Sequence, residues 1–424
     1  MKSIVNNIII DRSRKYFDFT ASGLAYRPIE NKIEKILLSY ANTHSNSNKN
    51  AMLTAQYYED ARVDLKKSLE LNDDFCILPC GTGASGAIKK FQELLGIYIP
   101  PKTKERYKID ISNKPLVIIG PFEHHSNEVS FREALCDVIR IPLSSEGSAD
   151  LEFLKKVLKE NKNREIIGSF SVASNVTGVF NPIKEISQLI RKYNGIVALD
   201  SASTSAYINI DNALYDVMFL SPHKLLGGIG SCGLLVIKKR LIDTTIAPTF
   251  AGGGTVSYVS AHHHTFLADA ETREDGGTPA ILQFIRASLA YRLRNSIGLE
   301  YIHRKKEELK KYFIYRMNEV DGVVRYCKNI ENKLPIFSFN IKDISPYRVA
   351  LLLSENYNID VRAGCSCAGP YGHDLLNLQE EKYKDVLKEN IGWIRVSIHY
   401  THTKKDIDYL IEAIKESSSS KVSA

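Results

Sequence analysis

Short apolar segments that alternate with amphipathic segments are the feature of this 424-residue chain that most constrains its fold. The runs FCILPC, PLVIIG, EIIGSF, IVALD and VMFL have the length and composition of buried strands. Between them, apolar residues recur at helical spacing, as in residues 87–95 and 151–158. Strands that alternate with helices form right-handed βαβ units. The pattern therefore predicts an α/β fold with a mostly parallel central sheet and helices on both faces.

Polar side chains stand where these predicted strands end. Thr82, His124, Asn175, Asp200 and Lys224 each come from the carboxyl end of a different strand. Open parallel sheets bind their ligands at this edge. Five such residues from five strands predict one shared ligand or cofactor site.

Lys224 is the most informative of these residues. It ends the sequence VMFLSPHK, and the glycine-rich LLGGIGSCG after it permits a tight return into another apolar strand. A lysine in such a place is either a solvated loop residue or an amine that forms a Schiff base with a carbonyl cofactor such as pyridoxal phosphate. That cofactor needs a carboxylate at its ring nitrogen, a stacking partner and a phosphate cradle.

For each of these requirements the sequence offers a candidate residue, and each candidate also has a simpler structural interpretation. Gly81–Ala84 precede a predicted helix, whose amino terminus can bind phosphate, although glycine-rich turns are often only turns. His124 and His125 are loop histidines, metal ligands or a stacking group. Asp200 either caps a turn or pairs with a protonated ring nitrogen.

The chain divides into five predicted parts. An N-terminal segment (1–20) precedes a large domain (21–280) that holds the candidate cofactor site. One long amphipathic helix (281–319) then connects to a smaller α+β domain (320–416). The serine-rich residues 417–424 are predicted to be a disordered tail.

Composition narrows the class of protein further. The chain is 44% apolar and 25% charged, as in ordinary globular proteins, and its net charge of +7 is spread without a basic block, so we expect no nucleic-acid partner. The opening residues hold only a three-residue apolar run, which predicts a cytoplasmic protein without a membrane partner. The seven cysteines are scattered and are interpreted as reduced thiols. No metal site is predicted, because consecutive histidines such as 262–264 rarely ligate one ion.

Eight motifs in order resemble the class V, fold-type I pyridoxal-phosphate enzymes, and among these the cysteine desulfurases and selenocysteine lyases. The motifs are GTGASGAI, EHHSN, SNVTG, the aspartate of LDSA, SPHK, GGTP, RAGCSCA and IRVSIHY. The resemblance covers about residues 16–414 and implies pyridoxal 5′-phosphate as cofactor and a homodimer.

The resemblance also implies roles for the cofactor site. Lys224 would bind the cofactor as a Schiff base and later move the Cα proton, Asp200 would keep the ring nitrogen protonated, and His124 would stack on the ring. Asn175 and Ser203 would lie near the ring hydroxyl. The phosphate would be bound by Thr82, Gly83, Ser221 and His223, with Thr278 reaching over from a partner subunit.

The implied substrate site is built around Cys367, which falls at the position of the nucleophilic cysteine. Arg395 and Arg362 would bind the carboxylate of a small amino acid, L-cysteine, together with Asn175. The Cys367 thiolate would attack the sulfur of the substrate, release alanine and keep the sulfur as a persulfide for a sulfur-acceptor protein.

Two departures from the family pattern leave alternatives open. Ser203 replaces the usual glutamine, and Cys365 with Ser366 replaces two histidines. Cys365 could accept the persulfide, form a regulatory disulfide or be idle. The alternative activities are those of another class V enzyme, namely a selenocysteine lyase, an epimerase or an aminotransferase in which Cys367 is incidental. A non-catalytic binding protein is a third reading.

Overall fold

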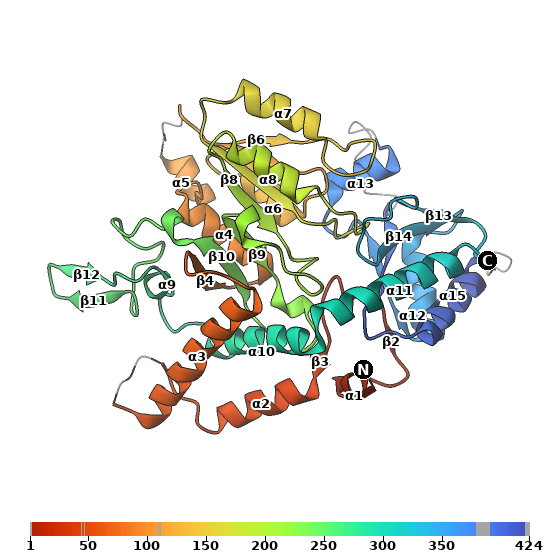
Figure 1. Ribbon diagram of the computed structural model, residues 1–424, viewed down its shortest axis with the longest axis horizontal. Helices are drawn as coiled ribbons and strands as arrows, with labels where there is room; N and C mark the ends of the chain where they lie inside the picture. The colour runs from red at the N-terminus through yellow and green to blue at the C-terminus, as the bar shows by residue number, and fades with distance from the viewer. Residues whose placement is uncertain are drawn as a thin grey trace.

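A seven-stranded sheet forms the centre of the large domain in the computed structural model, which describes residues 2–43, 45, 47–107, 109, 112–378 and 391–419 (Figure 1). The neighbouring strands β9, β8, β7, β5 and β6 pair in parallel, and β10 alone runs against its neighbours β9 and β4. This confirms the predicted α/β class with a mostly parallel sheet. The strand order is β4 (Phe75–Cys80), β10 (Gly233–Lys238), β9 (Val217–Leu220), β8 (Ile196–Asp200), β7 (Ile166–Ser171), β5 (Leu116–Ile119) and β6 (Asp137–Arg140).

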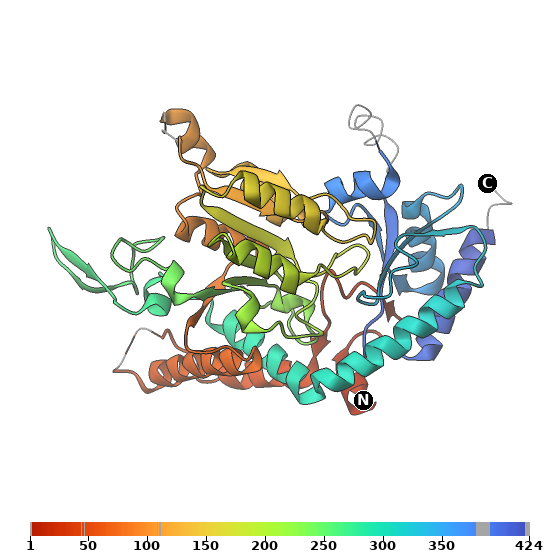
Figure 2. The same ribbon diagram turned by 45° about the horizontal axis from the view of Figure 1, so that its top comes forward.

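Apolar cores lie on both faces of this sheet, because successive side chains of a strand point to opposite faces. In β9, Val217 and Phe219 belong to one core and Met218 and Leu220 to the other. The first core also contains residues of the helices α4 (Gly83–Leu94) and α6 (His125–Arg132). The second contains residues of the helices α2 (Arg27–Leu37), α3 (Lys49–Ser68), α7 (Leu151–Glu160), α8 (Ile183–Arg191) and α10 (Ile281–Ile297) (Figure 2).

Two helices, rather than one, connect the large domain to the small one. The sequence predicts a single helix over 281–319, but α10 ends at Ile297 and α11 (Leu299–Met317) begins after Gly298. Gly298 has φ +92°, a conformation that glycine adopts without steric cost. The break lets α10 pack on α3 while α11 runs along the small domain (Figure 2).

The small domain is an antiparallel sheet covered by helices. Its strands lie in the order β13 (Val323–Arg325), β14 (Ile336–Ile341), β17 (Trp393–Ser397) and β16 (Arg362–Gly364). Helices α11, α12 (Pro346–Tyr357) and α15 (Lys404–Ser419) contribute to its core. Helix α15 continues past Glu416, and the predicted tail beyond Ser419 lies outside the described residues.

The N-terminal segment joins this small domain. Its strand β2 (Lys15–Tyr16) pairs in parallel with β15 (Ile359–Asp360), and the backbone N–H of Ser397 donates to the carbonyl of Phe17. The sequence does not show this contact, because the two segments are separated by most of the chain. The segment then crosses back toward the large domain through β3 (Ala25–Tyr26).

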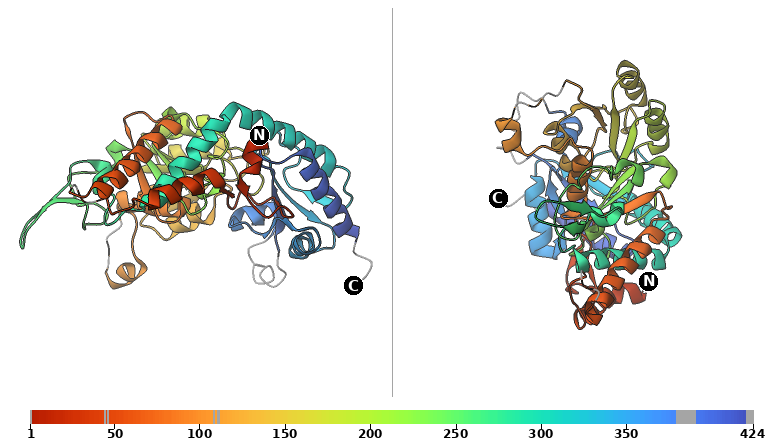
Figure 3. Two further views of the ribbon diagram at one scale, coloured as in Figure 1. Left: turned by 90° about the horizontal axis from the view of Figure 1, so that it is seen from below. Right: turned by 90° about the vertical axis from the view of Figure 1, so that its left-hand side faces the viewer.

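The remaining elements lie outside the two main sheets. A hairpin of β11 (Val256–Val259) and β12 (His264–Phe266) projects from the large domain (Figure 3). No helix in the described part of the chain is long and apolar enough to cross a membrane. The shorter elements are α1 (Lys2–Asn6), β1 (Ile8–Ile9), α5 (Pro101–Arg106), α9 (Ala270–Arg273) and α13 (Gly369–Leu376).

Replacement of Gly298 tests the role of the helix break. We expect Gly298→Ala to lower the free energy of unfolding by about 1–2 kcal/mol, because alanine is strained at positive φ. Gly253→Ala is the control, since a Cβ there meets no atom within 4 Å and φ is not in the positive range. Urea denaturation followed by circular dichroism measures both variants, and equal effects would contradict this explanation of the break.

Candidate functional site

A cleft of about 240 Å³ lies at the carboxyl ends of the parallel strands and also contacts the small domain. Every predicted site residue except Thr278 lines it. The large domain contributes Thr82, Gly83, His124, Asn175, Asp200, Ser203, Ser221, His223 and Lys224, and the small domain contributes Arg362, Cys367 and Arg395.

Lys224 lies in the short helix η2 (Pro222–Lys224), directly after β9. Burial lowers the pKa of its amine to about 8, an effect that Asp200 opposes and that Arg395 and Arg362 reinforce. Asp200 is buried at the end of β8, where its Oδ1 accepts a hydrogen bond from the backbone N–H of Ala202 at 2.9 Å. Burial raises the pKa of Asp200. The strands thus bring a partly buried lysine and a buried carboxylate to one cleft.

The amino terminus of α4 forms a small cradle. Gly83 has φ +55°, and a Cβ at this position would come within 2.8 Å of His223 Cε1 and 3.0 Å of Ser221 Oγ. Ser221 Oγ accepts a hydrogen bond from the N–H of Ala84 at 2.9 Å, and Thr82 is the N-cap residue. Burial lowers the pKa of His223 to about 4, so its imidazole is uncharged at neutral pH. Helix N–H groups and small polar side chains here suit an anionic group.

The two adjacent histidines make different contacts. His124 lines the cleft, and its Nδ1 accepts a hydrogen bond from the N–H of Ser126 at 3.1 Å. Burial, reinforced by Lys224, lowers the pKa of His124 to about 4, which leaves a neutral ring. His125 instead contacts the segment that carries Cys367: its Nε2 accepts from the N–H of Gly369 at 2.8 Å.

Asp18 is a site residue that sequence reasoning missed. Its Oδ1 accepts a hydrogen bond from Arg395 Nη2 at 2.8 Å, and its Oδ2 lies 3.0 Å from Arg362 Nη2. Arg395 is buried, and its Nη1 donates to the carbonyl of Asn175 at 3.1 Å. The only signal in the sequence was an acidic residue within the apolar YFDF, because the contact spans most of the chain.

Two buried polar atoms at this end of the cleft have no hydrogen-bond partner among the described residues. They are Arg395 Nε and Asn175 Oδ1. Buried polar groups are nearly always hydrogen-bonded. A ligand with a polar group at this position would satisfy them.

Cys367 lies on a loop of four residues between β16 and α13. Neighbouring groups hold this loop: Asn175 Nδ2 donates to the carbonyl of Ser366 at 2.8 Å, and Trp393 Nε1 donates to Ser366 Oγ at 3.3 Å. The backbone N–H of His125 donates to the carbonyl of Cys367 at 2.8 Å. The exposed thiol therefore lines the rim of the cleft on a short, fastened loop.

Ser203 lines the cleft, but its hydroxyl donates to the carbonyl of Ala173 at 2.8 Å. It therefore has a partner of its own in this structure. Ala84, part of the predicted phosphate-binding turn, also lines the cleft. Other lining residues that sequence reasoning missed are small or polar, which made them inconspicuous: Thr20, Ala21, Ser85, Ser126, Ser171, Ala173, Ala202 and Ser366.

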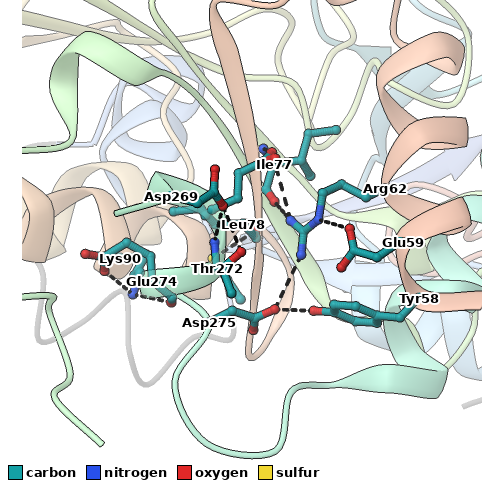
Figure 4. A network of polar contacts seen from close by, with 12 residues as sticks. Tyr58, Glu59, Arg62, Ile77, Leu78, Lys90, Asp269, Thr272, Glu274 and Asp275 are labelled. Carbon is teal, nitrogen blue, oxygen red and sulfur yellow. Dashed lines mark hydrogen bonds and ion pairs between the residues drawn. The ribbon is translucent and has the colours of Figure 1, made fainter. Parts of the chain in front are cut away.

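Thr278 lies outside the cleft, and its Oγ1 accepts a hydrogen bond from Asn42 Nδ2 at 3.1 Å. The polar contacts of Figure 4 fix the segment before it: Asp275 accepts from the hydroxyl of Tyr58 and lies 3.5 Å from Arg62 Nη2. A contact of Thr278 with a partner subunit stays a prediction, since the structure is of one chain.

The arrangement can be compared with known proteins. The family model for aminotransferase class V matches residues 15–410. The chain belongs to this family. Membership in the class-V aminotransferases confirms the resemblance and agrees with the partly buried lysine at the strand ends.

Two curated relatives carry the same name. A protein of Halalkalibacterium halodurans named "Probable cysteine desulfurase" is 29% identical over 71% of this chain and 70% of its own. One of Staphylococcus aureus (strain Mu50) with the same name is 26% identical over 95% of this chain and 91% of its own. Among solved structures, the apo cysteine desulfurase from Thermococcus onnurineus NA1 has a TM-score of 0.81 at 22% identity, covering 98% of this chain and 97% of its own, and it supports the fold.

Replacement of Asp18 tests its link to the arginines. We expect Asp18→Asn to lower the free energy of unfolding by about 3 kcal/mol, because the buried Arg395 loses its carboxylate partner. In the control Asp360→Asn, the pair with the partly exposed Arg14 should be worth less than about 1 kcal/mol. Urea denaturation compares the two, and a loss at Asp18 no larger than the loss at Asp360 would argue against a buried pair.

Proposed function

We propose that this class-V enzyme is a pyridoxal-phosphate-dependent cysteine desulfurase, which converts L-cysteine to L-alanine and keeps the sulfur on Cys367. The observation that carries the proposal is the meeting of a buried amine of lowered pKa, Lys224, and a thiol, Cys367, in one cleft with two arginines. The names of the curated relatives support the same activity.

The residues present fit pyridoxal 5′-phosphate. The cradle at Gly83, which a Cβ would fill, together with Ser221 and His223, would bind the phosphate. The neutral ring of His124 would stack on the pyridine, and Asp200 would face its nitrogen. Lys224 would bind the aldehyde carbon. When bound, this cofactor supplies an electron sink that makes the C–S bond of the substrate labile.

The substrate carboxylate is expected to bind Arg395. Asp18 occupies Nη2 and the carbonyl of Asn175 occupies Nη1, while Nε–H has no partner among the described residues. An arginine edge suits a carboxylate, and Asp18 would hold the guanidinium plane in place. Arg362, whose side chain is 44% exposed, would contribute charge from the outer side.

Lys224 and Cys367 would carry the proton and sulfur transfers. The uncharged Lys224 Nζ can take the proton from the substrate Cα and return a proton to carbon. The Cys367 thiolate attacks the substrate sulfur, the C–S bond breaks with its electron pair going to carbon, and that carbon takes a proton to give alanine. The sulfur stays on Cys367 as a persulfide.

A homodimer and a sulfur-acceptor protein are also part of the proposal. In the dimer, Thr278 of one subunit would approach the phosphate bound by the other. The resemblance to class V enzymes supports both. Asp275 anchors the GGTP segment through Tyr58 and Arg62, which would hold Thr278 in a constant position for its contact with the partner subunit.

The pH dependence of cofactor uptake tests the lowered pKa of Lys224. Only the uncharged amine reacts with an aldehyde, so uptake by the apo-protein should rise about tenfold per pH unit below the pKa of about 8 and level off above it. The growth of visible absorbance after mixing with pyridoxal phosphate measures this rate. Lys224→Ala should show no covalent band, and a flat pH profile would contradict the assignment.

Replacement of Cys367 tests the proposed activity. The wild type, given L-cysteine and dithiothreitol, should form alanine and sulfide in equal amounts. Cys367→Ser should lose at least about a hundredfold in both while it keeps the visible cofactor band, because the nucleophile is gone. Cys327→Ser, a partly exposed cysteine that does not line the cleft, is the matched control and should retain activity.

Other results of the same assay identify the alternatives. A band that shifts with L-cysteine, with keto acid or racemised amino acid and no sulfide, would indicate another class V reaction. Full activity in Cys367→Ser would exclude this cysteine as nucleophile. A protein without a visible band after added cofactor would indicate a binding protein.

A further inference from the structure

The first cysteine of the CSC sequence, Cys365, has no role in the reaction proposed for Cys367. It is exposed and does not line the cleft, whereas Cys367, two residues later, does. Both thiols are therefore accessible, but only one of them faces the candidate substrate. Relative to the cleft, Cys367 is therefore the inner cysteine and Cys365 the outer one.

A tight turn holds the two cysteines together. The N–H of Ala368 donates to the carbonyl of Cys365 at 3.0 Å, and the two central residues, Ser366 and Cys367, have φ of +53° and +56°. Positive φ at both central positions is the geometry of a type I′ turn. The turn reverses the chain within these four residues. Only Ser366 separates Cys365 from Cys367, which lies at the rim of the cleft.

Three hydrogen bonds to the turn keep Cys367 from moving away from the cleft. Ser366 accepts hydrogen bonds on its carbonyl and on its hydroxyl, and the carbonyl of Cys367 accepts one from His125. The donors belong to the large domain and to β17. A sulfur bound to Cys367 thus stays at the rim of the cleft, beside the candidate substrate site, whereas the exposed Cys365 lies outside the cleft.

We propose that Cys365 is a relay thiol that takes the sulfur from Cys367 and presents it to an acceptor thiol outside the cleft. This inference rests on the proposed function, since it needs a persulfide on Cys367. It identifies the partner chemically as a cysteine thiol on the surface of a folded protein, which as a whole does not enter a cleft of about 240 Å³.

The transfer is balanced without an added oxidant or reductant. The Cys365 thiolate attacks the outer sulfur of the Cys367 persulfide, and a new S–S bond forms at Cys365. The S–S bond at Cys367 breaks, and its electron pair stays on Cys367 as thiolate, which takes the proton that Cys365 lost. Attack on the inner sulfur would instead give a Cys365–Cys367 disulfide and free sulfide, and each cycle would then need a reductant.

Peptide mapping tests where the sulfur resides. Holoenzyme is mixed with one equivalent of L-cysteine without added thiol, alkylated, and cleaved after Arg362, and the peptide with both cysteines is fragmented in a mass spectrometer. The wild type should carry the extra sulfur on Cys365 as well as on Cys367. Cys365→Ser should carry it on Cys367 alone, and Cys367→Ser on neither cysteine.

A comparison of two thiol acceptors tests the relay in turnover. Dithiothreitol is small enough to enter the cleft, whereas a folded protein such as ubiquitin with one surface cysteine is not. The ratio of protein-dependent to dithiothreitol-dependent alanine formation should fall about tenfold in Cys365→Ser, because Cys365 is the thiol that lies outside the cleft. The ratio should keep its wild-type value in the control Cys327→Ser.

The outcomes separate this inference from the proposed function. An unchanged ratio in Cys365→Ser, or sulfur confined to Cys367 in the wild type, would overturn the relay and leave the desulfurase assignment in place. A Cys365–Cys367 disulfide with sulfide released in the absence of added thiol would also overturn it. No alanine and no sulfur on either cysteine would overturn the desulfurase proposal and the relay with it.

Discussion

The burial of the Lys224 amine beside Asp200 is the interaction on which the rest of the site depends. A lysine at the end of a central strand is withdrawn from water, which favours its uncharged form, and the nearby carboxylate only partly offsets this. The arrangement requires that β8 and β9 run in parallel, because only then do both side chains leave the sheet at the same edge. The parallel sheet is thus a condition for the chemistry as well as for the fold.

The second constraint is the ion pair that Asp18 makes with the arginines of the small domain. Arg395 and Arg362 stand on paired strands, β17 and β16, and Asp18 comes from the opposite end of the chain. The pair fastens the N-terminal segment across the small domain and fixes the guanidinium groups at the cleft. Together with the carbonyl of Asn175, it also holds both terminal nitrogens of Arg395 in hydrogen bonds.

The cysteine loop depends on both domains. Asn175 and His125 from the large domain hold the backbone of Ser366 and Cys367, and Trp393 of β17 holds the Ser366 side chain. The usual family pattern has two histidines before the nucleophile, whereas this chain has a thiol and a hydroxyl. The hydroxyl accepts a hydrogen bond from Trp393 that fixes the turn, and Cys365 stays exposed.

The sequence by itself determined the α/β class, the large-domain strand ends and most of the cleft residues. It could do so because strand and helix periodicities are local, and because parallel strands bring their carboxyl ends to one edge. It predicted one connecting helix and missed the break at Gly298, since a single glycine costs a helix too little to mark its end.

Only the tertiary structure decided the contacts between segments far apart in the chain. Asp18 on Arg395, Asn175 on the Ser366 carbonyl and the hydroxyl of Ser203 on Ala173 follow from how the segments pack, and no local pattern encodes such pairings. The opposite placements of Cys365 and Cys367 likewise result from a turn that neighbouring elements fix. Local periodicity specifies which elements form, whereas burial and hydrogen bonding across the assembled fold specify which side chains meet.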